Sequence, residues 1–190
     1  ESVFDCPMRG TLVHWEKLHT FNPAAVVREG KVHLLYRAED DSGEMKVGGH
    51  TSRIGLATSD DGVHFVREPA PVLYPANDDQ KGSEWDGGCE DPRIVEAPDG
   101  TYVLTYTQYN RKVARLAVAT SRDLRTWKKH GSAFRGAYGG KFEQTWSKSG
   151  AIVQELRGDR LVAVRVAGKY RMYYGEGTVY SASSDDLVRW

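Results

Sequence analysis

The sequence of 190 residues has no net charge, because 26 Lys and Arg side chains balance 26 Asp and Glu side chains. A balanced charge argues against nucleic-acid binding and against a polybasic membrane surface. No apolar run reaches about 18 residues, so no membrane-spanning helix is predicted. Only two cysteines, Cys6 and Cys89, are present, which excludes a disulfide framework and leaves the compartment, periplasmic or cytoplasmic, open.

Motifs for metal and nucleotide chemistry are also missing. The sequence has no His-x-x-x-His or Cys-x-x-Cys pair, no Gly-x-Ser-x-Gly elbow and no phosphate loop. We therefore expect neither a metal nor another cofactor. Amphipathic helical spacing is absent as well. What the sequence does contain is 20 Gly, 10 Tyr, 5 Trp and 5 Phe, a composition typical of a turn-rich all-β protein.

A turn signature recurs three times. In each copy a short strand enters a turn with Ser followed two residues later by Asp, and a large aromatic residue begins the outgoing strand. The Ser and Asp side chains can hydrogen-bond backbone amides two residues further on and so close the turn. A single copy is a common hairpin turn, but copies about 62 residues apart indicate a structural repeat. The copies are residues 54–65, 116–127 and 179–190.

Each repeat also contains a strand–turn–strand element before this turn. The third copy carries an insertion at residues 154–167, ahead of its return strand at residues 169–174. Units of about four short strands, repeated radially, are the blades of a β-propeller, whereas sandwiches do not usually repeat such a signature. We therefore predict a single propeller domain over residues 1–190, with about three four-stranded blades and an incomplete C-terminal side.

The densest group of reactive residues is Trp-Asp-Gly-Gly-Cys-Glu-Asp-Pro-Arg at residues 85–93. Its glycine pair permits close approach of a ligand, and Pro92 predicts an extended backbone at Asp91. Arg93 could hold a carboxylate in its guanidinium fork. Two interpretations stay open here: a functional site, or an Asx-turn that opens a strand.

The equivalent strand starts in the other units are also polar, with Asn22 in the first and Lys148 and Ser149 in the third. The innermost strands of a propeller surround its central channel. We therefore predict that Asn22, Asp91 and Lys148 or Ser149 converge on one funnel.

Tyrosines stand near charged residues where the return strands end. Aromatic rings beside carboxylates and arginine are typical of a carbohydrate site, because sugar C–H faces stack on rings and hydroxyls pair with charged groups. Tyr36 and Tyr106 lie inside their strands and are expected to pack between blades. Tyr109 and Glu176 lie at the ends, where a functional role is favoured.

Five motifs then occur in one order: Phe21-Asn-Pro-Ala-Ala, Leu35-Tyr-Arg-Ala-Glu-Asp, Ser52-Arg-Ile-Gly-Leu-Ala-Thr-Ser, Pro71-Val-Leu-Tyr-Pro and Gly88-Cys-Glu-Asp-Pro-Arg-Ile. This ordered set resembles glycoside hydrolase family 130, closely over about residues 20–130. The resemblance implies a five-bladed β-propeller that acts on β-mannosides, either as a phosphorylase or as a hydrolase.

The resemblance also implies roles for individual residues. The resemblance implies that Asp91 is the catalytic acid and that its proton passes through a sugar hydroxyl. Asn22 and Arg37 match the family's mannose-binding residues. The further substrate-binding residues expected at this stage are Asp40, Arg53, Arg93, Tyr109 and Lys148.

Departures from the family pattern bear on the reaction. Where phosphorylase members carry phosphate-binding arginines, this sequence has Lys148 and Glu176. We therefore predict an inverting β-mannosidase, with Asp91 as acid, Glu176 as base and Glu143 as the reserve base. An inverting enzyme needs two carboxyl groups about 6.5–9.5 Å apart, with water between them. Phosphorolysis is the alternative, kept open by Lys148, and a non-catalytic carbohydrate-binding propeller is the second alternative.

The expected partner is a β-mannoside oligosaccharide, with β-1,2 as the expected linkage. A homo-oligomer stays open, and neither a nucleic acid nor a membrane is expected as a partner.

Overall fold

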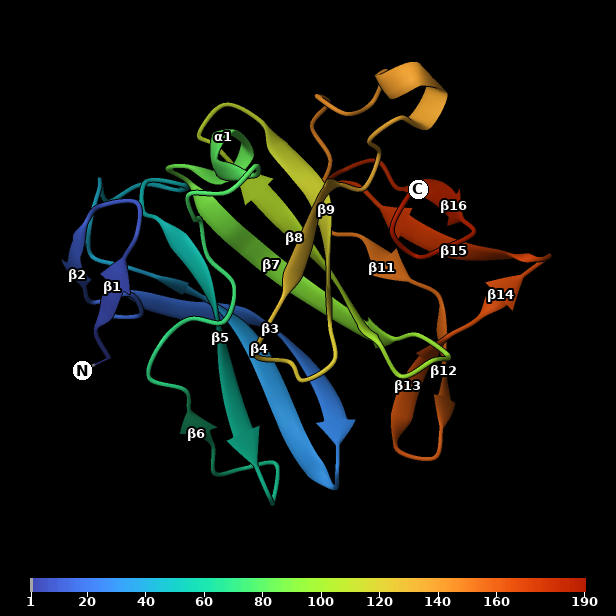
Figure 1. The fold of residues 1–190 in the computed structure, drawn as a ribbon, viewed down its shortest axis with the longest axis horizontal. Coiled ribbons are helices and arrows are strands. Elements are labelled where there is room, and N and C mark those ends of the chain that lie inside the picture. The colour runs from blue at the N-terminus through green and yellow to red at the C-terminus, as the bar shows by residue number, and fades with distance from the viewer. Residues whose placement is uncertain (1) are drawn as a thin grey trace.

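The computed structural model describes residues 2–190 and is almost entirely β (Figure 1). The strands form three groups in chain order, coloured blue to teal, green to yellow, and orange to red (Figure 1). The first group is a four-stranded antiparallel blade. Its strands are β3 (His19–Arg28), β4 (Lys31–Glu39), β5 (Ser52–Ser59) and β6 (Val66–Arg67).

The second blade repeats this order, again with antiparallel neighbours throughout. Its strands are β7 (Gly88–Glu96), β8 (Tyr102–Tyr109), β9 (Ala114–Ser121) and β10 (Lys128–Ser132). A parallel bridge between Ser52 and Gly88 joins it to the first blade. A short hairpin precedes the first blade, formed by β1 (Phe4–Cys6) and β2 (Thr11–Val13), and the only two helical segments between residues 2 and 190 are α1 (Lys81–Glu84) and the 3₁₀ turn η1 (Ala137–Gly140).

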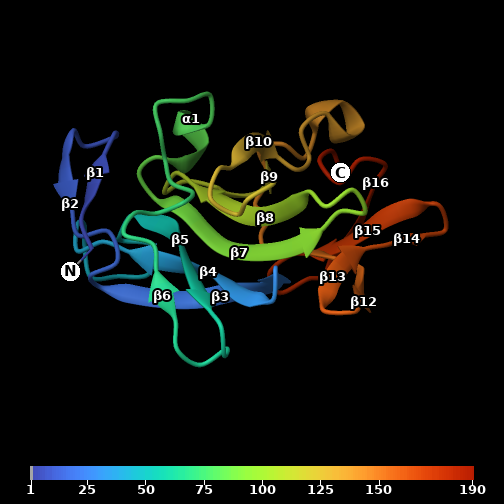
Figure 2. The ribbon, with the colours of Figure 1, turned by 60° about the horizontal axis from the view of Figure 1, so that its bottom comes forward.

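The third group departs from the template, as the insertion predicted. Its inner edge is split into β11 (Ala151–Ile152) and β14 (Arg165–Val166), which both pair with β15 (Lys169–Tyr174). The other edge of β15 pairs with β16 (Tyr180–Ser184). Between the two inner pieces the chain leaves as a hairpin of β12 (Gln154–Arg157) and β13 (Arg160–Ala163), which touches β7 (Figure 2).

The repeated turn forms the same hydrogen-bond network in all three blades. In the second blade Ser121 Oγ accepts from the amides of Asp123 and Leu124 at 3.1 and 2.8 Å. Asp123 Oδ1 in turn accepts from the amides of Arg125 and Thr126 at 2.8 and 2.7 Å. The predicted turn chemistry is thus confirmed. The corresponding networks in the other blades start at Ser59 and Ser184.

The core lies between blades, because successive strand residues point to opposite faces. On β8, Leu104 and Tyr106 face the first blade, whereas Val103 packs towards the third. Both faces of this blade are therefore buried, which explains its nearly continuous apolar strands. Burying a large apolar side chain stabilises the fold by about 1.5–3 kcal/mol, so these interfaces hold the blades in register. The chain is thus an all-β propeller segment of about three blades. No helix between residues 2 and 190 is long and apolar enough to cross a membrane.

Candidate active site

A residue in the left-handed region lies near the start of the inner strand of each blade. These residues are Asn22, Asp91 and Ser149, with φ of 46°, 49° and 57°. In β3 and β7 the residue lies inside a register shift, which marks a β-bulge. A bulge bends the strand and redirects a side chain. The extended backbone predicted for Asp91 is therefore wrong: the bulge overrides the preference that Pro92 imposes.

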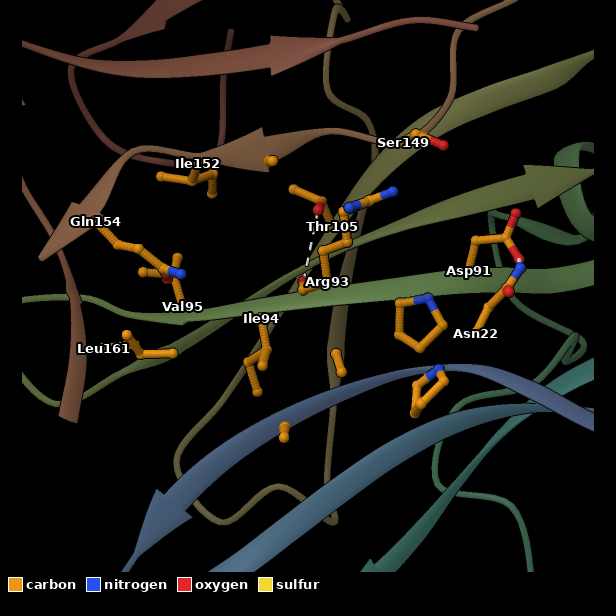
Figure 3. Close-up of a pocket in the computed structure, with 15 residues that line it drawn as sticks. Asn22, Asp91, Arg93, Ile94, Val95, Thr105, Ser149, Ile152, Gln154 and Leu161 are labelled. Carbon is orange, nitrogen blue, oxygen red and sulfur yellow. Dashed lines mark hydrogen bonds between the residues drawn. The ribbon is translucent and has the colours of Figure 1, made fainter. Parts of the chain in front are cut away.

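A cavity of about 390 Å³ lies between these inner strands. The first blade contributes Asn22, the second Asp91 and Arg93, and the third Ser149 (Figure 3). The predicted convergence of the three strand starts is thus seen, with Ser149 rather than Lys148 in the lining. Gln154 of the inserted hairpin lines the end opposite Asp91 (Figure 3).

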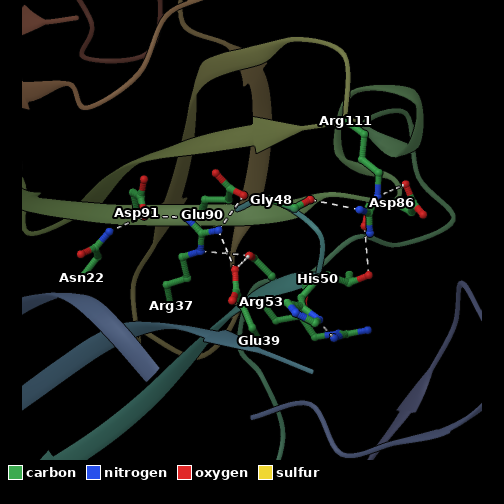
Figure 4. Close-up of polar contacts among 12 residues, drawn as sticks. Asn22, Arg37, Glu39, Gly48, His50, Arg53, Asp86, Glu90, Asp91 and Arg111 are labelled. Atoms are coloured by element: carbon green, nitrogen blue, oxygen red, sulfur yellow. Dashed lines mark hydrogen bonds and ion pairs between the residues drawn. The ribbon is translucent and has the colours of Figure 1, made fainter. Parts of the chain in front are cut away.

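Asp91 is held by donors from the neighbouring blade. Its Oδ1 accepts hydrogen bonds from Asn22 Nδ2 at 2.8 Å and from an Arg37 guanidinium nitrogen at 3.1 Å (Figure 4). Burial disfavours the charged form of Asp91, but the Asn22 hydrogen bond and the charges of Arg37 and Lys148 outweigh it. The pKa of Asp91 is consequently below its usual value.

Arg37 serves three carboxylates at once. Besides Asp91, its guanidinium contacts Glu39 Oε1 at 2.8 Å and Glu90 Oε1 at 2.9 Å, and its Nε donates to Ser52 Oγ at 2.9 Å. Burial raises the pKa of Glu90 to about 7; Arg37 opposes this shift and the Asp91 charge adds to it.

The sequence pattern did not mark Glu39 or Glu90 as site residues. Glu39 stands two residues after Arg37 on β4, and strand alternation puts both on the same face, so a signal existed. Glu90 and Asp91 are consecutive, and a regular strand would send them to opposite faces. Only the bulge between Glu90 and Arg93 lets both reach Arg37.

Asp40 and Arg53 form a separate pair. Asp40 Oδ2 lies 2.7 Å from an Arg53 guanidinium nitrogen, and the two side chains are 0% and 1% exposed. Neither residue lines the cavity. In this structure they pair with each other in the interior, and no accessible surface supports their predicted contact with substrate.

Glu143, the reserve base, lies in the segment after η1 and does not line the cavity with Asp91. It is close enough to Arg115 to favour the charged guanidinium, although burial dominates and lowers the pKa of Arg115. Its role as a base stays a prediction.

Glu176 lies outside the cavity lining, although the sequence predicted that it would face Asp91 across the channel. Its side chain is 59% exposed, with Oε1 3.7 Å from Lys148 Nζ. Its Oε2 accepts a hydrogen bond of 3.1 Å from Trp146 Nε1. Tyr109 is close by, with its ring centroid 6.4 Å from that of Trp146. Trp146 was not predicted, and nothing in its sequence neighbourhood marks it.

No group of three or more His, Cys, Asp or Glu side chains within residues 2–190 is arranged to hold a metal ion. The two cysteines are free and buried.

Comparisons with known proteins show which family the chain resembles. A family model described as beta-1,4-mannooligosaccharide phosphorylase matches residues 9–190. A 1,2-beta-oligomannan phosphorylase from Thermoanaerobacter sp. (strain X514) is 33% identical over 181 residues, which cover 93% of this chain and 53% of that protein.

Two solved structures are more similar. A glycosyl hydrolase from Bacteroides ovatus is 54% identical, with a TM-score of 0.97, over 100% of this chain and 52% of the other. The second has the same identity and TM-score over 100% of this chain and 53% of the other. It comes from work stating that the GH130 family of mannoside phosphorylases contains glycoside hydrolases that target β-1,2 mannosidic linkages in Candida mannan. The chain spans about half the length of these relatives. It belongs to glycoside hydrolase family 130.

Proposed function

We propose that the full-length protein cleaves β-1,2-mannosidic linkages, with Asp91 as the general acid. The observation that carries this proposal is the position of Asp91 at the cavity between three blades, held by Asn22 and Arg37. Both donors bind Oδ1 of Asp91. No residue between 2 and 190 donates a hydrogen bond to Oδ2. The second oxygen is therefore available to a substrate.

The electrostatics of the cluster set a condition on this role. Asn22, Arg37 and Lys148 all favour ionised Asp91 in the free protein, yet an acid must carry a proton before it can donate one. A sugar that fills the cavity expels water and makes the charged form less favourable. A hydroxyl of the same sugar can relay the proton from Asp91 to the glycosidic oxygen, as family resemblance suggests.

Inorganic phosphate is the acceptor that the comparisons favour. The family description and the Thermoanaerobacter relative both name phosphorylases, so phosphorolysis has better support than the hydrolysis predicted from sequence. In this reaction a phosphate oxygen bonds to C1 while the C1–glycosidic oxygen bond breaks. The leaving oxygen takes a proton from the relaying sugar hydroxyl, which takes one from Asp91 in turn. Arg93 in the cavity lining and Lys148 beside it are the cations available to the anion.

Water is the second candidate acceptor. The specific observation in its favour is Glu176, whose carboxylate lies beside Lys148 and would repel a phosphate dianion. The 54% identical structure from the work on β-1,2-mannoside hydrolases supports the same choice. Glu176 lies outside the cavity lining, however, so a direct role as base requires movement towards the substrate.

Product analysis tests the proposal. The full-length protein is incubated with β-1,2-mannobiose, with and without phosphate, beside Asp91→Asn and a control, Asp99→Asn, which changes an exposed carboxylate on the β7–β8 turn. Mannose 1-phosphate that forms only with phosphate, and is lost only in Asp91→Asn, is the expected result. Free mannose without phosphate selects hydrolysis. Binding without turnover, or full activity in Asp91→Asn, refutes the assignment of Asp91.

A further inference from the structure

We propose that Trp146, Tyr109 and Glu176 form a rim subsite that binds a sugar of the oligosaccharide beyond the bond that is cleaved. The subsite deepens the proposed function and rests on it, since it serves the same mannoside substrate. It lies outside the cavity lining but continues directly from it, because Lys148 contacts Glu176 and is followed by the lining residue Ser149.

The first observation is a corner of two aromatic rings. Trp146 is 56% exposed, a large open surface for the bulkiest side chain of the fold. The Tyr109 and Trp146 ring planes meet at 68°, with centroids 6.4 Å apart. They come from different places, the end of β8 and the segment before β11. An open indole face beside a second ring can receive the C–H face of a sugar.

The second observation is that the backbone around Trp146 is fixed. The Ser147 amide donates to the Ala114 carbonyl at 2.9 Å, and Ser147 Oγ accepts from the Leu116 amide at 3.1 Å. The Lys148 carbonyl accepts from the Gly175 amide at 2.9 Å. The backbone next to the exposed indole is thus held between β9 and the end of β15, so a ligand would not have to order this segment on binding.

The third observation is that two side chains hold the carboxylate of Glu176. Trp146 and Lys148 are two residues apart, and the side chains of both reach Glu176. Trp146 Nε1 reaches one carboxylate oxygen at 3.1 Å, and Lys148 Nζ lies 3.7 Å from the other. This fixes a half-exposed acceptor beside the ring corner, where it can accept hydrogen bonds from sugar hydroxyls.

The combination selects a neutral sugar chain as the occupant. A carboxylate at the rim repels anionic ligands, while a ring face and a fixed hydrogen-bond acceptor suit a hydroxylated ring. The reacting sugar is assigned to the cavity with Asn22, Arg37 and Asp91. The rim beside it is therefore left for the part of the chain that departs after cleavage.

The test measures binding rather than turnover, so that it is separate from the test of catalysis. In the full-length Asp91→Asn protein, calorimetry gives the Kd of a β-1,2-mannotriose and of mannose, with and without Trp146→Ala. We expect Trp146→Ala to raise the trisaccharide Kd about tenfold and to leave mannose binding unchanged. Trp146→Phe keeps a ring but loses the Glu176 contact and should give a smaller rise, as should Glu176→Gln.

Leu156→Ala is the matched control, because it removes a large exposed side chain from the β12–β13 hairpin and should change neither Kd. An unchanged trisaccharide Kd in Trp146→Ala overturns the subsite, and so does an equal loss for mannose and trisaccharide. If the full-length protein failed to turn over mannosides, the comparison of Kd values would still test the subsite. If it bound no mannoside at all, both proposals would be overturned.

Discussion

Replacing Glu90 by Gln should remove much of the decrease in unfolding free energy that the protein shows between about pH 5 and about pH 8. Glu90 is 4% exposed and shares the Arg37 guanidinium with Glu39 and Asp91. Burial is the main cause that raises its pKa to about 7, against the opposing charge of Arg37. The interior thus holds more carboxylates than one guanidinium can compensate.

The sign follows from proton binding in the two states. Between the unfolded pKa, about 4.3 for Glu, and the folded pKa of about 7, the folded state keeps a proton that the unfolded state has lost. The contribution of Glu90 to the unfolding free energy is therefore highest below its unfolded pKa and is lost as pH rises through its folded pKa. The difference between the two pKa values corresponds to a loss on the order of 3 kcal/mol. Gln stays neutral throughout, so Glu90→Gln lacks this loss.

Urea unfolding of the full-length protein at a series of pH values measures the effect. The unfolding free energy of Glu90→Gln should decline less than that of the wild type over this range. Glu155→Gln is the control, because Glu155 is an exposed carboxylate on β12 and its removal should leave the wild-type decline intact. Parallel pH profiles for the wild type and Glu90→Gln would refute the reasoning.

Two further predictions concern the scaffold. Asp40→Ala should lower the unfolding free energy by about 3–5 kcal/mol, because it leaves the guanidinium of Arg53 buried without a counter-charge; urea unfolding measures this, and a change below the error of the method would contradict it. Ser121→Ala should lower the unfolding free energy by about 1–3 kcal/mol, because the amides of Asp123 and Leu124 lose their acceptor inside the repeated turn. Thermal unfolding checks it, and an unchanged midpoint would show that water replaces the hydroxyl.

The repeated turn could be predicted from sequence because its interactions are local. Each of these hydrogen bonds to Ser121 and Asp123 joins residues at most three positions apart. The local sequence is therefore sufficient to determine the turn. The order of strands within a blade could be predicted for the same reason, since each hairpin pairs two strands that are consecutive in the sequence. The inserted hairpin of the third blade was also visible, as an interruption of the repeat.

The site was less predictable, because its geometry depends on strand pairing across the chain. Pro92 indicated an extended Asp91, but the register between β7 and β8 places a bulge there, and the backbone becomes left-handed. The same bulge brings Glu90 to Arg37. Neither result can be read from the local sequence, since both depend on a register shift.

Glu176 shows a different limit. Its chemical type and its place after β15 suggested a base, but its partners, Trp146 and Lys148, lie about 30 residues earlier in the chain. A carboxylate with free access to a cavity and a carboxylate held at the rim have the same sequence signature. Only the position of the β15 end against the segment before β11 distinguishes them.

The close contact between the first two blades explains why the acid is placed as it is. Ser52 donates its amide to the Gly87 carbonyl at 2.8 Å, and its Oγ accepts from Arg37. A Cβ at Gly88 would meet the Ser52 carbonyl oxygen at 2.1 Å, so glycine is required for this approach. Ser52 therefore both joins the blades and orients the arginine that reaches across to Asp91. Because the charge partner and the acid belong to different blades, the ionisation of Asp91 depends on how tightly those blades meet.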